Sequence, residues 1–106
     1  MSDKEEIVKD IVDMASRKYP KSELYLFGSQ ANGTSKGLSD YDILVLLDLD
    51  KVPLSKEIAI MDDFYELELR TGAIISPIIY SKSNWNNTRR NTLLFERISK
   101  NAIRLR

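Results

Sequence analysis

The chain contains neither cysteine nor histidine among its 106 residues. Without cysteine there is no disulfide, no thiolate nucleophile and no Cys-ligated zinc or iron–sulfur site. Without histidine there is no Ser-His-Asp triad, no imidazole base and no imidazole metal ligand. Catalysis within this chain would therefore depend on carboxylates, Lys, Arg, hydroxyl groups or backbone amides, and a bound metal would be a hard cation such as Mg²⁺ or Mn²⁺.

Long apolar runs are also missing, since none reaches the ~18 residues that a membrane span needs. The first residues, Met-Ser-Asp-Lys-Glu-Glu, lack the basic-then-apolar pattern of a signal peptide, so we expect a cytoplasmic protein with no membrane partner. The composition is 42% apolar and 30% charged, which is typical of a globular chain. We expect a single domain over residues 1–106.

The net charge is zero, but the charges are unevenly placed. Residues 82–106 carry seven basic side chains and one acidic side chain, and the remainder of the chain is acidic. Such a segment is either a solvated helix end or a contact surface for a phosphate-rich ligand or an acidic partner. Because exposed aromatic residues are not interleaved with the basic ones, the pattern supports nucleic-acid binding only weakly.

Apolar periodicity predicts alternating helices and strands. Helices are expected over 2–19 and 53–71, strands over 23–27, 43–47 and 73–80, and two further helical pieces from 81 onward. In the second helix the apolar residues that lie on one face are Ile58, Met61, Tyr65 and Leu69. Pro77 predicts an edge or irregular position for the last strand. The alternation predicts an α/β (α+β) fold, with a small mixed sheet of about three strands flanked by helices.

One stretch of the chain stands out for its chemistry. It reads Leu26-Phe27-Gly28-Ser29-Gln30-Ala31-Asn32-Gly33 and, after a short loop, Ser39-Asp40-Tyr41-Asp42-Ile43-Leu44-Val45. Gly28 lets the backbone approach a ligand, and free N–H groups at a helix start favour phosphate. Ser29 can hold a phosphate oxygen or cap a helix, which is the commoner use of such a serine. Lys36 can reach a triphosphate or remain a solvated loop lysine.

Asp40 and Asp42 are two residues apart at the start of a strand, so their carboxylates project from the same face. Like charges this close raise each other's pKa unless a cation lies between them. A Mg²⁺ ion bound to a triphosphate would satisfy both carboxylates. The alternative is that both face water at a strand end. The apolar run after Asp42 favours the metal interpretation, because it places the pair at the rim of the core.

The string G-S-x-A-x-G, followed by S-D-x-D and an apolar strand, resembles the signature of the nucleotidyltransferase superfamily related to DNA polymerase β. The chain is most similar to the minimal, stand-alone domains of that superfamily in prokaryotes. The resemblance implies the nucleotidyltransferase fold, with Gly28, Ser29, Ser39 and Lys36 near the phosphates of a nucleoside triphosphate. It implies that Asp40 and Asp42 are catalytic and bind Mg²⁺ or Mn²⁺. A nucleoside monophosphate would pass to a hydroxyl of a protein, RNA or small molecule, and pyrophosphate would leave.

The chain departs from the family pattern at two positions. Asn32 stands where Arg is common in related domains, which removes a possible phosphate contact. The second departure concerns the metal ligands. Active members of the superfamily carry a third carboxylate on a later strand, and the corresponding segment here, 73–80, contains neither Asp nor Glu. Ser76 is the polar residue at its centre, and we expect it at the third-carboxylate position. A neutral serine binds metal weakly and is a poor base, so catalysis is open while nucleotide binding is not affected.

Four functions therefore remain open. The first is a metal-dependent nucleotidyltransferase. The second is a catalytically weak or inactive antitoxin module, since small domains of this type resemble antitoxins encoded beside an all-helical HEPN ribonuclease toxin. The third is a nucleotide-binding regulatory domain, and the fourth is an α/β domain whose loop only looks like the motif. The sequence does not indicate the nucleotide, the acceptor, the partner or the oligomeric state.

Overall fold

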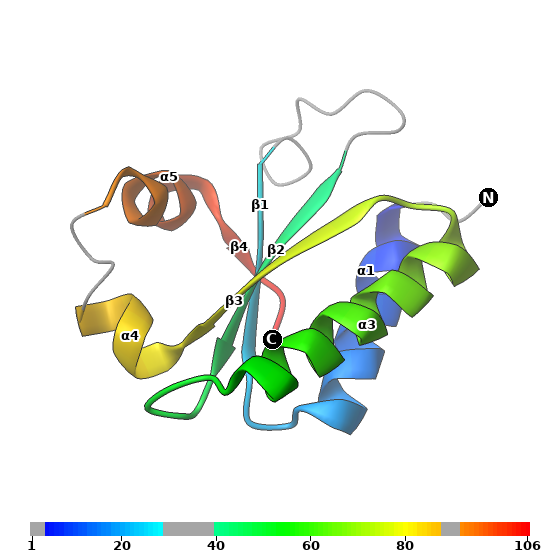
Figure 1. Cartoon of the computed structure of the whole chain (residues 1–106). Helices are drawn as coiled ribbons and strands as arrows, with labels where there is room; N and C mark the ends of the chain where they lie inside the picture. Colours follow the sequence, from blue (N-terminus) through cyan, green and yellow to red (C-terminus); the bar gives the residue numbers. More distant parts are fainter. Residues whose placement is uncertain (1–3, 29–39, 88–91) are drawn as a thin grey trace.

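The computed structural model describes residues 4–28, 40–87 and 92–106 (Figure 1). The elements are α1 (Lys4–Lys18), β1 (Glu23–Phe27), β2 (Tyr41–Leu47), α3 (Leu54–Thr71), β3 (Ile75–Ser81), α4 (Lys82–Asn87), α5 (Leu93–Asn101) and β4 (Ile103–Arg104). Within these ranges the strands form one sheet in the order β3-β2-β1-β4. Strand β1 is antiparallel to both β2 and β4, whereas β2 and β3 are parallel, so the sheet is mixed as predicted.

Strand β4 was not expected, because the chain from residue 81 onward was predicted to be helical apart from its loops. The strand has two residues and is held by backbone pairing rather than by an apolar pattern. Beyond its end, the Leu105 N–H donates to the Leu24 carbonyl at 2.8 Å, and the Leu24 N–H donates to the Arg106 carbonyl at 3.2 Å. Backbone pairing leaves no periodic trace in side chains, so the fourth strand could not be predicted from hydrophobicity.

The sheet is covered on both faces, and its residues alternate between two apolar clusters. Helices α1 and α3 lie on one face, where Ile43 and Val45 pack with Phe64 of α3. Helices α4 and α5 cover the other face, where Leu44 packs with Trp85. All five residues of the apolar run 43–47 are buried, which confirms the prediction of a strand buried on both sides. Strand β3 is an edge strand, as Pro77 indicated.

Helix α3 buries a different face from the one that the apolar spacing had aligned. Its buried apolar residues are Ile60, Phe64 and Leu67. The aligned set, Ile58, Met61, Tyr65 and Leu69, is exposed by 49–69%. Both sets recur every three or four residues, so periodicity alone cannot choose between them.

Trp85 anchors the short helix α4 to the rest of the domain. It is 4% exposed, and its ring centroid lies 5.2 Å from that of Tyr80 and 5.2 Å from that of Phe95. These contacts join β3, α4 and α5, so Trp85 is part of the core rather than a free surface for stacking on a base. No helix in the described parts of the chain combines the length and the apolar character needed to cross a membrane.

Candidate functional site

Asp42 lies near the start of β2, in the interior of the sheet. Its register partners are Phe27 on β1 and Ser76 on β3. Directly paired residues of neighbouring strands share a face, so Asp42 and Ser76 project on the same side of the sheet. This is the side covered by α4 and α5. Asp42 is half-buried, and Asp40, two residues earlier, is exposed.

Ser76 thus stands beside Asp42, where the third carboxylate was expected to lie. The pairing comes from the parallel register of β2 and β3, which matches Asp42 with Ser76 and Ile43 with Pro77. The placement agrees with the sequence-based expectation, and the role of Ser76 at a metal stays a prediction. Among the described residues no group of three or more carboxylates gathers at one point.

Gly28 ends β1 directly against the carboxylate of Asp42. Its φ is +78°, a left-handed conformation that residues with a side chain rarely adopt. A Cβ at this position would stand 2.4 Å from Oδ2 of Asp42 and 3.4 Å from its Cγ. A side chain at this position would displace the carboxylate, so the backbone of Gly28 lies directly against Asp42.

The charge on Asp42 is unfavourable in this setting. Burial raises the pKa of the Asp42 carboxyl above its usual range, and the nearby charge of Asp40 raises this pKa further. Arg97 on α5 lowers the same pKa in part. A cation bound between the two carboxylates would relieve both penalties, so the pair is suited to a ligand that brings positive charge.

In the sequence Arg97 is marked only as one basic residue of the segment 82–106. The fold brings it within electrostatic reach of Asp42. No local spacing in the chain links the two residues, because Asp42 lies on β2 and Arg97 on α5, far apart in the sequence. Sequence patterns therefore carried no signal for this contact.

The oxygen atoms around Asp42 fit a hard divalent cation. Two carboxylates, with the hydroxyl of Ser76 on the same face, form an all-oxygen donor set of the kind Mg²⁺ or Mn²⁺ prefers. Mg²⁺ is often held by one or two carboxylates together with substrate phosphates. The described residues thus suit a metal that arrives with a nucleotide, and they do not supply the three-carboxylate set that the resemblance implies for an active enzyme.

The remaining predicted phosphate contacts, Ser29, Lys36 and Ser39, lie outside the described residues. The same holds for Asn32. Their roles stay predictions.

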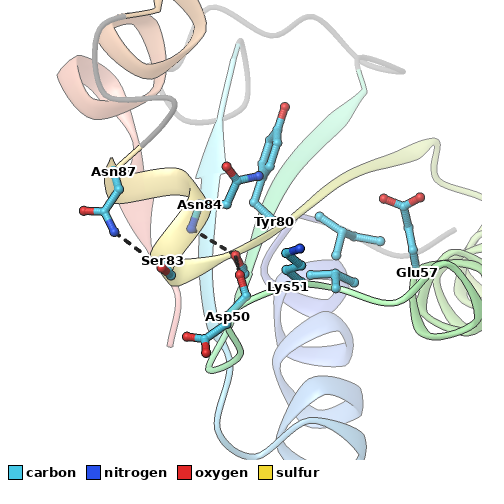
Figure 2. A pocket seen from close by; sticks show the side chains of 10 residues that line it. Asp50, Lys51, Glu57, Tyr80, Ser83, Asn84 and Asn87 are labelled. Carbon is cyan, nitrogen blue, oxygen red and sulfur yellow. Dashed lines mark hydrogen bonds between the residues drawn. The ribbon is translucent and has the colours of Figure 1, made fainter.

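A groove of about 610 Å³ lies at the opposite end of the parallel strand pair, where Figure 2 shows its lining. Ser81 Oγ there donates to the Asp50 carbonyl at 3.0 Å and accepts from the Asn84 N–H at 3.0 Å. Ser81 is thus satisfied within the fold and caps the start of α4. Of the predicted site residues that the structure describes, none borders this groove, so the candidate site is the end of the sheet that carries Asp42.

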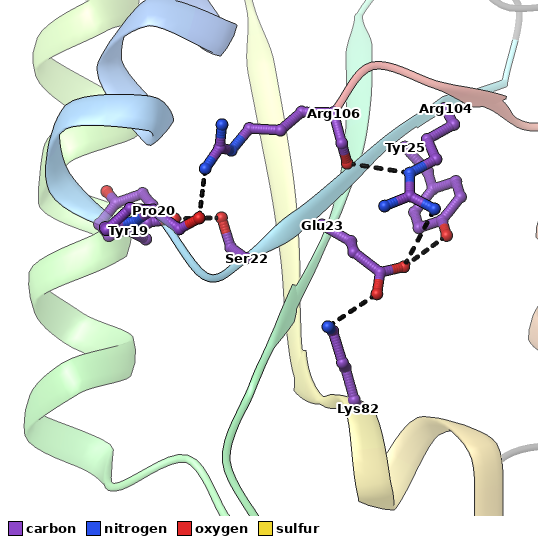
Figure 3. Close-up of polar contacts among 8 residues, drawn as sticks. All are labelled: Tyr19, Pro20, Ser22, Glu23, Tyr25, Lys82, Arg104 and Arg106. Atoms are coloured by element: carbon purple, nitrogen blue, oxygen red, sulfur yellow. Dashed lines mark hydrogen bonds and ion pairs between the residues drawn. The ribbon is translucent and has the colours of Figure 1, made fainter.

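Glu23, on the same sheet, differs from Asp42 because its carboxylate is paired with neighbouring side chains (Figure 3). Its carboxylate accepts a hydrogen bond from the Tyr25 hydroxyl at 2.7 Å. Lys82 Nζ lies 2.8 Å from one carboxylate oxygen, and Arg104 Nη1 lies 3.9 Å from the other. These groups join β1, α4 and β4, so Glu23 holds the fold together and is not a candidate ligand.

One protein family matches most of the chain, and several solved structures have a similar fold. The sequence profile of the nucleotidyltransferase domain family matches residues 8–99 of the chain. The fold is similar to a toxin–antitoxin structure containing AMP-PNP, with a TM-score of 0.69, 23% identity, and coverage of 93% of this chain and 72% of that one. None of the curated proteins matches the chain in sequence.

Two further solved structures have the same fold. The toxin–antitoxin pair MntA–HepT gives a TM-score of 0.64 and 19% identity, covering 97% of this chain and 72% of that chain. The tri-AMPylated Shewanella oneidensis HEPN toxin in complex with its MNT antitoxin gives 0.65 and 19%, covering 96% of this chain and 71% of that one. At these identities the likeness shows the fold alone.

Proposed function

The chain belongs to the nucleotidyltransferase domain family, and on that premise we propose that it transfers a nucleoside monophosphate from a nucleoside triphosphate to a hydroxyl group. The observation that carries the proposal is the pair Asp40 and Asp42, in which the negative charge of Asp42 is unfavourable. Asp42 has a raised pKa beside Asp40, and the Gly28 turn leaves no room for a side chain against its carboxylate. A carboxylate kept in this state is poised for a cation.

In this function Asp40 and Asp42 hold Mg²⁺ or Mn²⁺, and the Gly28 turn lets the backbone come near the phosphates. The cation, when bound, neutralises charge on the phosphates and on the transferring group. The acceptor hydroxyl gives up its proton to water, and its oxygen forms a bond to the α-phosphorus. The bond from that phosphorus to the bridging oxygen breaks, and pyrophosphate leaves with the electron pair. Ser29, Ser39 and Lys36 are the further phosphate contacts that we propose from the sequence.

The fold neighbours support a nucleotide and a partner. One of them contains AMP-PNP, and another is a complex of an MNT antitoxin with a tri-AMPylated HEPN toxin. By analogy we propose ATP as the nucleotide and a hydroxyl on a HEPN-type protein as the acceptor.

Ser76 favours a second candidate function. A neutral hydroxyl stands in register with Asp42, where active relatives carry a carboxylate. The hydroxyl binds metal weakly and does not act as a base at neutral pH. A module with this site could bind the metal–nucleotide and a HEPN-type partner without turnover. The two candidates share the site and differ only in whether the nucleotide is cleaved.

A transfer assay separates the two. The full chain is incubated with α-labelled ATP or GTP, Mg²⁺ or Mn²⁺, and the HEPN-type protein encoded nearest to it. We expect label on that protein, lost in Asp42→Asn and kept in Glu23→Gln. The second variant is the matched control, because it makes the same carboxylate-to-amide change on the same sheet away from the site.

A stable complex with the partner and bound nucleotide, without label transfer, would establish the second candidate instead. Label transfer that is equal in wild type and Asp42→Asn would show that the acidic pair is not the site.

A further inference from the structure

Helix α3 presents a row of apolar side chains to solvent, here named the α3 stripe. Its members and their exposed fractions are Leu54 (70%), Ile58 (51%), Met61 (49%), Tyr65 (58%) and Leu69 (69%). Single exposed apolar residues are ordinary on a protein surface, whereas a continuous row marks an interaction site. The stripe is not needed for the fold, because α3 packs on the sheet through Ile60, Phe64 and Leu67.

The spacing of the stripe is that of a helix–helix seam. Successive members are three or four residues apart, so they form one line along the helix. From Leu54 to Tyr65 the steps follow the alternation of the apolar positions in a heptad repeat. Met61 and Tyr65 belong to the residue types enriched at the centres of protein interfaces. The stripe therefore matches a second helix laid along α3.

The charges that α3 itself places beside the stripe have one sign, and basic residues of α1, Arg17 and Lys18, lie near the stripe only at its Leu69 end. Within α3, the charged residues three or four positions from a stripe member are Glu57, Asp62, Glu66 and Glu68. The two basic residues of the helix, Lys56 and Arg70, stand at no such spacing from it. Glu68 is already engaged, since its Oε1 accepts from the Ile75 N–H at 2.6 Å.

We propose that the α3 stripe is a docking surface for an amphipathic helix of another protein, with Lys or Arg on both sides of its apolar seam. Charges that border a helix–helix seam select the partner and its orientation. A second copy of α3 in either direction would set acidic flanks against acidic flanks, which disfavours pairing of the chain with itself. The proposal does not depend on nucleotidyl transfer.

The stripe also leads toward the candidate site. Three residues separate the end of α3 from β3, whose first residue, Ile75, is the register partner of Tyr41. A helix laid along the whole stripe would thus run from the groove, which Glu57 of α3 lines, to the end of the sheet that carries Asp42. Figure 1 shows α3 along the side of the sheet opposite α4 and α5, so the docked helix would leave those helices uncovered.

Two synthetic helical peptides test the proposal. Both carry leucine at the seam positions, and the flanking positions are lysine in one and glutamate in the other. Fluorescence anisotropy with the full chain should show the lysine peptide bound at least about tenfold more tightly than the glutamate peptide. Ile58→Asn should weaken the lysine peptide by about tenfold. Leu93→Asn, at an exposed leucine of α5 outside the stripe, should leave its affinity unchanged.

A charge reversal sharpens the test. The double variant Asp62→Lys with Glu66→Lys makes one of the two flanks basic and leaves Glu57 on the other, so it should remove most of the preference for the lysine peptide. Equal affinity of the wild-type chain for the two peptides, or no binding of either, would overturn the proposal. A concentration-dependent dimer in sedimentation that becomes a monomer in Ile58→Asn would also overturn it, because the stripe would then serve a second copy.

Discussion

Asp42 and Glu23 are two carboxylates on one face of one sheet, and the fold shifts their pKa values in opposite directions. Glu23 pairs with Leu46 at one end of β2, and Asp42 pairs with Phe27 at the other. Hydrogen bonding from Lys82 holds the pKa of the Glu23 carboxyl below its usual range despite burial. Burial and Asp40 raise the pKa of Asp42.

The contrast separates a carboxylate that stabilises the fold from one that the fold leaves for a ligand. The chain supplies Glu23 with Lys82, Arg104 and a tyrosine hydroxyl. Asp42 has a like charge two residues away and only partial compensation from Arg97. A carboxylate whose charge costs stability and borders a glycine turn is better explained by binding than by packing.

The largest loss of stability is expected for Gly28→Ala, and Gly72→Ala is its matched control. Both glycines have positive φ, +78° and +76°, so alanine costs about 1–2 kcal/mol of backbone strain at either position. At Gly28 the new Cβ would also meet Asp42 Oδ2 at 2.4 Å, whereas at Gly72 nothing lies within 4 Å. Gly28→Ala should therefore lose about 1–3 kcal/mol more in urea unfolding. Equal losses would mean that Gly28 does not press on the carboxylate.

Ser76→Asp should convert the pair into a three-carboxylate set. Without metal the added charge beside Asp42 should lower stability by about 1 kcal/mol. With Mn²⁺ the third oxygen ligand should raise metal affinity by about tenfold, measured as a larger rise of Tm on titration. Ser76→Asn is the control, because it changes size without adding charge. If both variants respond alike to Mn²⁺, Ser76 is not at the metal.

Glu23→Gln should cost about 1 kcal/mol at neutral pH, because it removes the ion pair with Lys82. Since folding lowers the pKa of Glu23, its contribution is fully present above the ordinary range of a glutamate. The contribution is lost as the pH falls through the lowered pKa. Urea unfolding at a series of pH values should therefore show wild type and variant converging in acid. A difference that persists unchanged at low pH would contradict this assignment.

Asp42→Asn should have the smallest effect on stability, and of the opposite sign. In EDTA at neutral pH the amide removes a charge that burial and Asp40 both disfavour, while the loss of attraction to Arg97 offsets part of the gain. We expect a change between zero and a few tenths of a kcal/mol in favour of the variant. A clear loss of stability in urea unfolding would show that Asp42 is structural, like Glu23.

Local signals in the sequence were enough for the parts of the fold that side-chain patterns control. The run 43–47 predicted a strand covered on both faces, because such a strand is apolar at every position. Pro77 predicted an edge strand, because proline lacks the N–H that an interior strand needs for pairing. The motif between Gly28 and Val45 indicated the family. The family resemblance placed Ser76 beside Asp42, and the parallel register of β2 and β3 agrees with that placement.

The remaining features depend on contacts between distant segments. Strand β4 forms through backbone pairing with β1, which hydrophobicity does not encode. Helix α3 is apolar on two faces, and only the sheet decides that Phe64 turns inward while Tyr65 turns outward. Arg97 reaches Asp42 through the docking of α5. None of these has a local signature.

Asp42, in this account, binds a divalent cation together with a nucleotide. Calorimetric titration of ATP and of GTP, each with and without Mg²⁺, into wild type, Asp42→Asn and Glu23→Gln tests it most directly. We predict binding that requires Mg²⁺, survives in Glu23→Gln and disappears in Asp42→Asn. Binding of equal strength in Asp42→Asn, or no metal-dependent binding to the wild type at millimolar nucleotide, would contradict the claim.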